Sequence, residues 1–279
     1  MLLSTRTNFR DHFFVLLHLR EVVLSGRRKR RKKRSKAPGI IFALLIITAV
    51  AIIGYVKRDS LIPFFENVMQ RAEQIAAEEK ISGTYIDPDL IPEYCGEPYG
   101  VINGNIPELE KQEGLTEFEK YGALDGLGRC SAAYACVSRY TMPYKERESI
   151  GAVKPTGWHL VKYEGIDGNY LFNRCHLIAY QLTGENANER NLITGTRYMN
   201  TEGMLPFEIR VADYVKKTGH HVLYKVVPVF KGNNLVADGV WMQALSVEDD
   251  EISFNVFCYN VQPGIEIDYR TGDSRRVQG

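Results

Sequence analysis

The sequence predicts an α+β domain that follows a single membrane-spanning helix. Residues 39–56 form an uncharged apolar run, whereas 222–230, 235–247 and 252–259 are rich in β-branched and aromatic residues. Before these β-rich runs, apolar residues recur at helical spacing from 207 to 215. The globular part of the chain is therefore expected to combine helix and strands.

The apolar run carries an orientation signal. As a helix its 18 residues would rise about 27 Å, near the roughly 30 Å of a hydrocarbon core. Residues 1–36 hold twelve Lys and Arg against two acidic residues, a net charge of +10. By the positive-inside rule we expect a basic cytoplasmic tail (1–38), a transmembrane helix (39–56) and an extracellular remainder at the cell membrane. A buried core helix and a cleaved signal peptide are the alternatives for the run. Nucleic acid or a nuclear import receptor are alternative partners of the tail.

Composition divides the remainder into three segments. We expect a stalk or linker at 57–94, which begins as a polar helix over 57–80. An irregular, proline-rich wrapping segment is expected over 81–110. The folded domain is expected at 95–268 and an unstructured polar tail at 269–279. Residues 37–279 carry a net charge of −9, which counts against a general electrostatic grip on nucleic acid. A polyanion site here must be a local basic patch or depend on a metal.

Further elements are expected inside the folded domain. They are short elements at 115–121 and 129–136, a loop and strand within 151–162, a strand at 170–174 and a hairpin turn at 231–234. Pro206 suits the first turn of the predicted helix, and Gly219 suits its end.

Five polar residues carry the most information about function: Arg174, His176, Asn191, Asn200 and Glu208. A histidine can take a proton from water near neutral pH. Amide and carboxylate oxygens suit a hard cation such as Mg²⁺, which keeps several of its waters. An arginine or the metal offsets charge on a phosphate. The set therefore favours cleavage of a phosphodiester with one divalent metal.

Each of these residues also has an ordinary structural interpretation. A histidine after a strand is more often structural, the asparagines suit turns or caps, and a helical glutamate is usually solvated. The spacing favours function. If Asn200 opens the helix, Glu208 lies about two turns later and projects to roughly the same side. A helix start beside a strand end is also a good place for a polyanion.

The same region contains longer motifs, namely Asn173-Arg-Cys-His-Leu-Ile-Ala-Tyr180, Glu189-Arg-Asn-Leu-Ile-Thr194, Met199-Asn200, Phe207-Glu208 and the upstream Gly157-Trp-His159. With them the sequence resembles the DNA/RNA non-specific endonucleases over roughly 95–265. These are the ββα-metal (His-Me finger) nucleases, which include the membrane-anchored nucleases of bacterial DNA uptake. The resemblance implies a ββα-metal core with a central antiparallel sheet. It implies metal-dependent hydrolysis of DNA, with RNA as a further candidate, bound through the backbone without sequence specificity.

The resemblance also implies a role for each motif residue. His176 matches the general base, and Asn200 matches the one direct protein ligand of Mg²⁺, for which Mn²⁺ is an alternative. Asn191 matches a residue that supports the metal–water arrangement, and Glu208 matches the carboxylate that holds metal-bound water. Arg174 matches an arginine with a phosphate-contacting or structural role. The products would carry 5′-phosphates, and the DNA-uptake machinery is a candidate partner.

Two residues depart from the family's usual Asp-Arg-Gly-His motif. Asn173 replaces the Asp, which removes a negative charge near the metal. Cys175 replaces the Gly, which removes backbone freedom and puts a thiol beside the base. A Cys175 nucleophile is one alternative, although adjacent strand residues point to opposite faces. A disulfide with Cys130, or a buried thiol, is the favoured interpretation. A non-catalytic surface DNA-binding protein of the same fold is the other alternative function.

Weaker candidates lie around the motif. Lys154, Arg190 and Arg197 are candidates for a groove that binds the nucleic-acid backbone, although each also suits a solvated surface position. We expect Trp158 and Tyr198 in the core and not as stacking platforms for bases.

Overall fold

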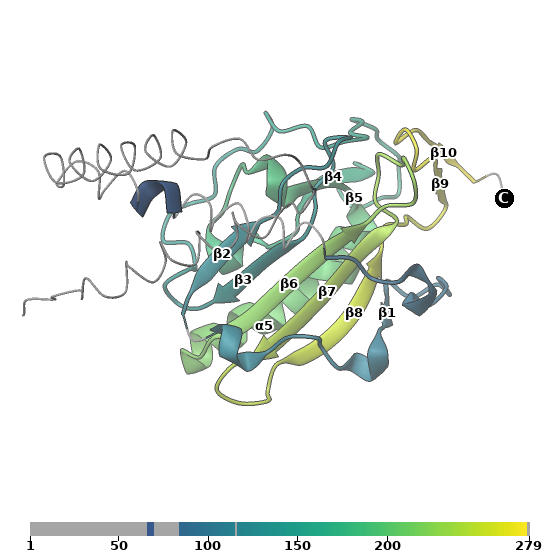
Figure 1. Ribbon diagram of the computed structural model, residues 1–279. Helices are drawn as coiled ribbons and strands as arrows, with labels where there is room; N and C mark the ends of the chain where they lie inside the picture. Colours follow the sequence, from purple (N-terminus) through teal and green to yellow (C-terminus); the bar gives the residue numbers. More distant parts are fainter. Residues whose placement is uncertain (1–65, 70–83, 115, 278–279) are drawn as a thin grey trace, which may run out of the picture. The chain divides into compact units, whose positions relative to one another are not determined.

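The computed structural model describes residues 66–69, 84–114 and 116–277, and its main element there is a six-stranded antiparallel sheet (Figure 1). The sheet order is β1-β8-β7-β6-β3-β2, and β4 and β5 form a separate antiparallel pair. The strands are β1 Tyr99–Val101, β2 Phe118–Tyr121, β3 Ala133–Val137, β4 Phe172–His176, β5 Leu192–Thr196, β6 Val222–Val229, β7 Gly239–Ser246, β8 Ser253–Tyr259, β9 Ile265–Ile267 and β10 Ser274–Arg276. The helices are α4 Tyr180–Thr183 and α5 Leu205–Thr218, with a π-helical turn at Met199–Met204 and short 3₁₀ turns at Pro88–Leu90, Asn103–Asn105, Lys111–Gly114 and Glu189–Asn191. The predicted α+β class with a central antiparallel sheet is confirmed.

The predicted membrane anchor falls outside the described residues. Within the ranges given above, no helix is long and apolar enough to cross a membrane. The transmembrane helix expected at 39–56 and the basic tail at 1–38 are not described and stay predictions.

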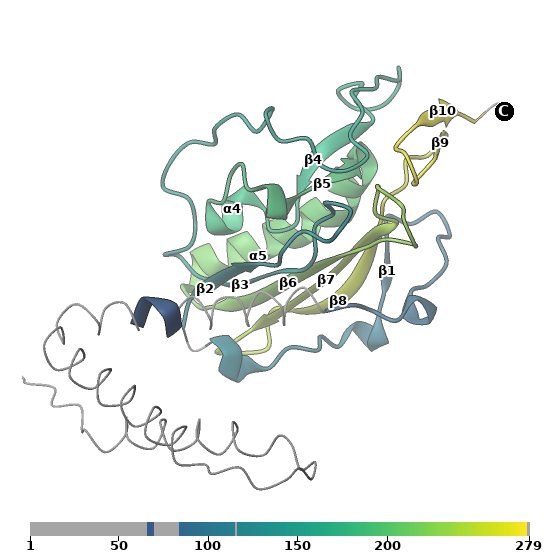
Figure 2. The same cartoon turned by 45° about the horizontal axis from the view of Figure 1, so that its top comes forward.

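Both faces of the large sheet are covered. Along β6, Tyr224 and Val226 belong to the core cluster shared with α5, whereas Leu223 and Val227 belong to a second cluster. This alternation arises because successive strand residues point to opposite faces. Helix α5 lies on the first face (Figure 2), and residues of the segment 84–114 cover the second. The predicted wrapping segment is thus part of the core.

β4, β5 and α5 form the ββα unit that carries the motif. β4 extends to His176, which pairs with Leu192 at the start of β5. The sequence does not predict β5, since its five residues include Gly195, and glycine weakens a strand. Helix α5 has Pro206 in its first turn and ends at Gly219, whose φ of 77° is left-handed. Both predicted ends of this helix are confirmed.

Three predicted elements differ from the structure. The range 151–162 forms no strand, only an isolated bridge at Lys162. The strand predicted from 235 begins at Gly239, because the Val236 N–H donates to the C-terminal segment instead of a neighbouring strand. That polar segment is itself ordered, since β10 pairs with β9. The expectation of an unstructured tail is therefore wrong for this part.

Gly195 explains how the chain accepts a cysteine where the motif usually has glycine. A Cβ at position 195 would lie 2.3 Å from the Cys175 sulfur and 2.6 Å from the Met199 methyl carbon. We expect Gly195→Ala to destabilise the fold by about 1–3 kcal/mol through overpacking, measured by urea unfolding. Cys175→Ala should recover part of that loss in the double variant. An equal cost in both backgrounds would contradict the proposed packing of Cys175 against Gly195.

Candidate functional site

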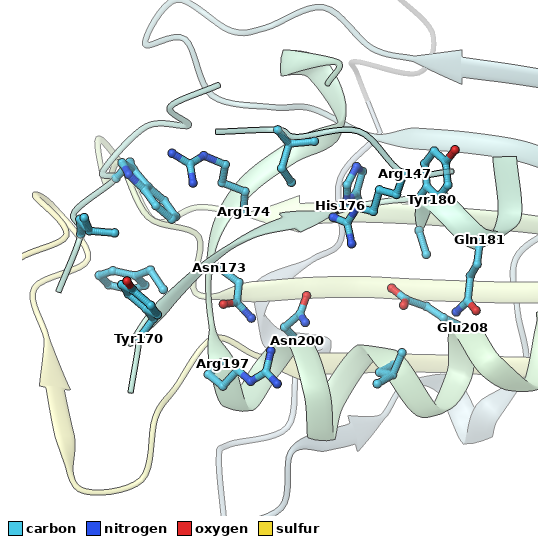
Figure 3. A pocket seen from close by; sticks show the side chains of 16 residues that line it. Arg147, Tyr170, Asn173, Arg174, His176, Tyr180, Gln181, Arg197, Asn200 and Glu208 are labelled. Carbon is cyan, nitrogen blue, oxygen red and sulfur yellow. Dashed lines mark hydrogen bonds between the residues drawn. The ribbon is translucent and has the colours of Figure 1, made fainter. Parts of the chain in front are cut away.

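The three central residues of the motif line one cavity of about 630 Å³ (Figure 3). His176 comes from the end of β4, Asn200 from the π-helical turn and Glu208 from α5. Each element of the ββα unit therefore places one predicted functional side chain in the same space.

The π-helical turn improves the alignment of Asn200 and Glu208. In a regular α-helix a residue eight positions on overshoots two turns by about 80°. A π-helical turn is wider, with i→i+5 hydrogen bonding, so each of its residues rotates the chain by less. Residues 199–204 have this geometry, which reduces the overshoot and brings both side chains to the cavity. The sequence predicts the shared face but not the π geometry.

His176 is held in one tautomer. Its side chain is 7% exposed, and its Nε2 lies 2.8 Å from the Asn186 carbonyl oxygen, which can only accept. Nε2 therefore carries the proton, and Nδ1 is the acceptor. The Arg147 guanidinium donates to Nδ1 at 3.3 Å. Burial, and secondarily the Arg147 charge, lower the pKa of His176 to about 4. The ring is thus neutral near pH 7, and its basic nitrogen Nδ1 accepts the hydrogen bond from Arg147.

Glu208 is a buried carboxylate that lacks a close partner. It is 8% exposed, and burial raises its pKa to about 8, an effect that the Arg147 charge partly offsets. Its carboxylate makes no hydrogen bond or ion pair with any residue in the described ranges, and the same holds for the Asn200 amide. A buried charge without compensation is unfavourable. The two oxygen donors on one cavity therefore fit a divalent cation that keeps several waters. Among the residues described, no group of three or more His, Cys, Asp or Glu is arranged to hold a metal.

Two motif residues have their polar atoms engaged with backbone. The Asn191 amide bonds both the N–H and the carbonyl of Ile178, at 2.9 and 3.0 Å, and its side chain is fully buried. It fixes the loop that follows His176 and does not line the cavity, so the role implied by the resemblance, support of the metal–water arrangement, does not fit its placement. Arg174 donates to the Val153 and Gly151 carbonyls and stacks on Trp158, with 4.1 Å to the ring centroid. These contacts favour the structural role for Arg174, although it borders the cavity.

The three weaker candidates for a groove that binds the nucleic-acid backbone do not lie together. Arg197 lines the cavity and pairs with Asp167 at 2.5 Å. Lys154 lines a different cavity of about 330 Å³, and Arg190 lines neither.

Several cavity residues were missed from the sequence. Arg147, Tyr180 and Gln181 border His176, and Asn173 points toward Asn200 (Figure 3). Arg147 lies 29 positions before His176 in an irregular loop, so neither spacing nor periodicity relates the two. Asn173 was noted only as a departure from the motif.

The structure decides among the three interpretations of Cys175, namely a nucleophile, a disulfide partner of Cys130 and a buried thiol. Cys175 is fully buried, does not line the cavity, and burial raises the pKa of its thiol well above the usual range. A thiol nucleophile at this position is therefore excluded by the geometry. All five cysteines are free, and the Cys130 sulfur donates to the Glu189 and Leu192 carbonyls. The disulfide with Cys130 is wrong, and the buried thiol is confirmed.

Residues 109–247 match the family described as DNA/RNA non-specific endonuclease. The chain belongs to the DNA/RNA non-specific endonuclease family. A protein named deoxyribonuclease from Streptococcus dysgalactiae subsp. equisimilis is 32% identical over 189 residues, which are 62% of this chain and 55% of the relative. The chain thus spans about half the length of that curated relative.

Solved structures agree with this assignment. NucA from Streptococcus agalactiae, with a magnesium ion bound, is 25% identical, with a TM-score of 0.60 over 66% of this chain and 89% of that one. The Sda1 nuclease, with a bound zinc ion, shares the fold at 24% identity, with a TM-score of 0.54 over 66% of this chain and 97% of that one. The central antiparallel sheet with few helices is the fold of ββα-metal nucleases. The family is metal-dependent.

Arg147 offers a test of the electrostatics of the site. Because its charge lowers the pKa of His176, we expect Arg147→Met to raise that pKa, although burial keeps it below 6.5, the ordinary value. Nuclear magnetic resonance of the histidine rings against pH measures the shift without any substrate. Lys145→Met is the matched control, since its ammonium lies over the Tyr144 ring. An unchanged His176 titration in Arg147→Met would show that the guanidinium does not act on the ring.

Proposed function

We propose that this chain is an endonuclease that hydrolyses DNA phosphodiesters with one divalent cation, Mg²⁺ or alternatively Mn²⁺. One observation carries the proposal. The unprotonated Nδ1 of a neutral His176 is held in the same cavity as two oxygen donors, Asn200 and Glu208. The names of the relatives, a deoxyribonuclease and NucA with bound magnesium, support the same substrate and ion.

The chain's own residues would act mainly on protons and charge. Nδ1 of His176 accepts the proton of the attacking water, while the Asn186 carbonyl holds Nε2–H and so fixes the ring. The Arg147 guanidinium, which donates to Nδ1 in this structure, would turn to a phosphate oxygen of the substrate and so free Nδ1 for the water. Asn200 and Glu208 would hold the cation, which when bound supplies charge compensation for the phosphate and the departing 3′ oxygen. Cleavage of the bond between the phosphorus and this 3′ oxygen leaves products with a 5′-phosphate.

The location and biological role are part of the proposal. We place residues 39–56 in the cell membrane and the endonuclease domain outside, on the basis of the uncharged run and the basic residues before it. The substrate would then be extracellular DNA, with RNA as a second candidate. The biological role would be DNA uptake together with an uptake machinery, nutrient scavenging, or degradation of extracellular nucleic acid. Protease accessibility of the domain on intact cells tests the orientation.

Cleavage of supercoiled plasmid by the full chain tests the activity. We expect nicking with Mg²⁺ or Mn²⁺, none with EDTA, and retention of activity in Cys175→Ser. A parallel reaction with RNA of the same length measures the ratio of the two activities. Binding of plasmid without nicking under every metal condition would overturn the proposal in favour of a non-catalytic DNA-binding protein.

A further inference from the structure

The catalytic groups line only one end of the cavity (Figure 3). His176, Arg147 and Glu208 lie at one end, and Tyr170 lies at the other, beyond Asn173 and Asn200 (Figure 3). Trp158 and Leu160 belong to the same lining. Trp158, Leu160 and Tyr170 together contribute two aromatic side chains and one aliphatic side chain to this wall of the cavity, and we call these three residues the aromatic wall.

The aromatic wall rests on its own small core. Leu171 and Phe172 are buried in a cluster against which Trp158 and Val161 pack. The Leu171 N–H bonds the Val161 carbonyl at 3.0 Å, so the two chain segments are fixed side by side. Leu160 and Tyr170 lie outside that cluster, and they are 73% and 38% exposed. Apolar surface that is held rigidly and left open beside a reactive centre is typical of a ligand site. The expectation that Trp158 is a core residue is therefore only half correct, since it packs on this cluster and also lines the cavity.

The surroundings of the aromatic wall are cationic. The Lys162 ammonium lies 4.5 Å from the centroid of the Tyr170 ring, and the Arg174 guanidinium stacks on Trp158. Residues 37–279 as a whole are acidic, with a net charge of −9. Non-specific electrostatic binding of the phosphate backbone is therefore weak, and affinity for nucleic acid must come from a local contact. Stacking of bases on aromatic rings is such a contact, because it does not require a basic surface.

We infer that the aromatic wall is a stacking platform for an unpaired nucleobase next to the scissile phosphate, so that single-stranded nucleic acid is the substrate class this site binds best. The inference rests on the proposed function and adds the substrate class to it. A base can lie flat on Tyr170 only when it is free of its own stack, and leaving a duplex costs a few kcal/mol. A single strand presents its bases without that cost.

Binding tests the platform independently of cleavage. The probe is a single-stranded oligonucleotide with one 2-aminopurine, bound by the full chain carrying His176→Ala in the presence of Mg²⁺. Stacking on the platform should quench the fluorescence of the probe. Adding Tyr170→Ala should remove the quenching and raise Kd about tenfold, whereas Tyr170→Phe, which keeps the ring, should preserve both the quenching and the Kd. Tyr140→Ala is the matched control, since Tyr140 is 91% exposed and outside the cavity. A Kd that is the same in Tyr170→Ala and Tyr140→Ala overturns the inference.

Cleavage then separates this inference from the proposed function. With His176 intact, Tyr170→Ala should lower kcat/KM about tenfold on a single-stranded oligonucleotide and less than about twofold on its duplex. An equal loss on both substrates would indicate a sugar or phosphate contact and overturn the platform. If the wild-type chain cuts neither substrate, the proposed function is wrong, and the fluorescence measurement still decides the platform. Thermal unfolding of each variant shows whether the fold is retained.

Discussion

Replacing His176 with alanine is expected to lower kcat/KM for DNA cleavage by about 10²- to 10⁴-fold, the usual contribution of a positioned general base. The hydrogen bond from Nε2 to the Asn186 carbonyl oxygen holds the imidazole ring in position. Among the described residues no other histidine lines the cavity, so none can replace it as the base. The measurement is initial nicking rate at saturating Mg²⁺. DNA affinity should change little, because the imidazole acts on water and not on the substrate. His159→Ala is the matched control, since that histidine lies outside the cavity, and a comparable loss there would contradict the assignment.

The same substitution should change how stability depends on pH. The folded-state pKa of His176 is about 4, below the 6.5 of a free histidine. The unfolded chain therefore binds the additional proton between these two values, and stability falls as pH decreases from 6.5 to 4. The loss amounts to about 3 kcal/mol at most. His176→Ala removes this term, so its urea midpoint should decline less over that window. Parallel declines in both proteins would show that the ring is not buried as a neutral group.

The sequence predicted the parts of this site that depend on local periodicity. A strand end and the start of a helix bring His176, Asn200 and Glu208 together, and such patterns are short-range. Arg147 was missed because it reaches the site from a loop without periodicity, through tertiary packing alone. Asn191 was placed in the site by its motif position, whereas its amide is directed to the Ile178 backbone. Side-chain direction in a 3₁₀ turn does not follow from spacing.

The strand β5 and the aromatic wall show a similar limit. β5 contains Gly195, which lowers strand propensity but is required by the Cys175 sulfur, which occupies the space that a Cβ at position 195 would need. The requirement is visible only once the two strands are paired. The sequence predicts Tyr170 and Leu160 in strands. In the structure only an isolated bridge joins 162 and 170, and both residues line the cavity. In both cases the tertiary contact, and not the local sequence, determines the role of the residue.

Glu208→Gln is expected to lower cleavage by about 10²-fold or more while it stabilises the metal-free protein at alkaline pH. Burial raises the pKa of Glu208 to about 8, whereas an unfolded glutamate has a pKa near 4.5. A group whose pKa is raised on folding contributes stability that is present below the unfolded value and is lost as pH rises through the folded value. In EDTA at pH 9, the wild-type protein therefore carries an uncompensated buried carboxylate. The neutral amide of the same shape avoids this, with a gain of up to about 5 kcal/mol.

Two comparisons make this prediction specific to a cation site. At pH 4.5 the wild-type carboxyl is largely protonated, so the two proteins should have nearly equal Tm values. At pH 9 the addition of Mg²⁺ should raise Tm of the wild-type protein, because an ion that binds only the folded state stabilises it, and should raise Tm of Glu208→Gln less. The function thus depends on a carboxylate that is unfavourable until the ion is bound. Equal Tm values in EDTA at pH 9 would mean that Glu208 is already compensated within the protein, and the main physical reason for placing a cation beside Asn200 would be lost.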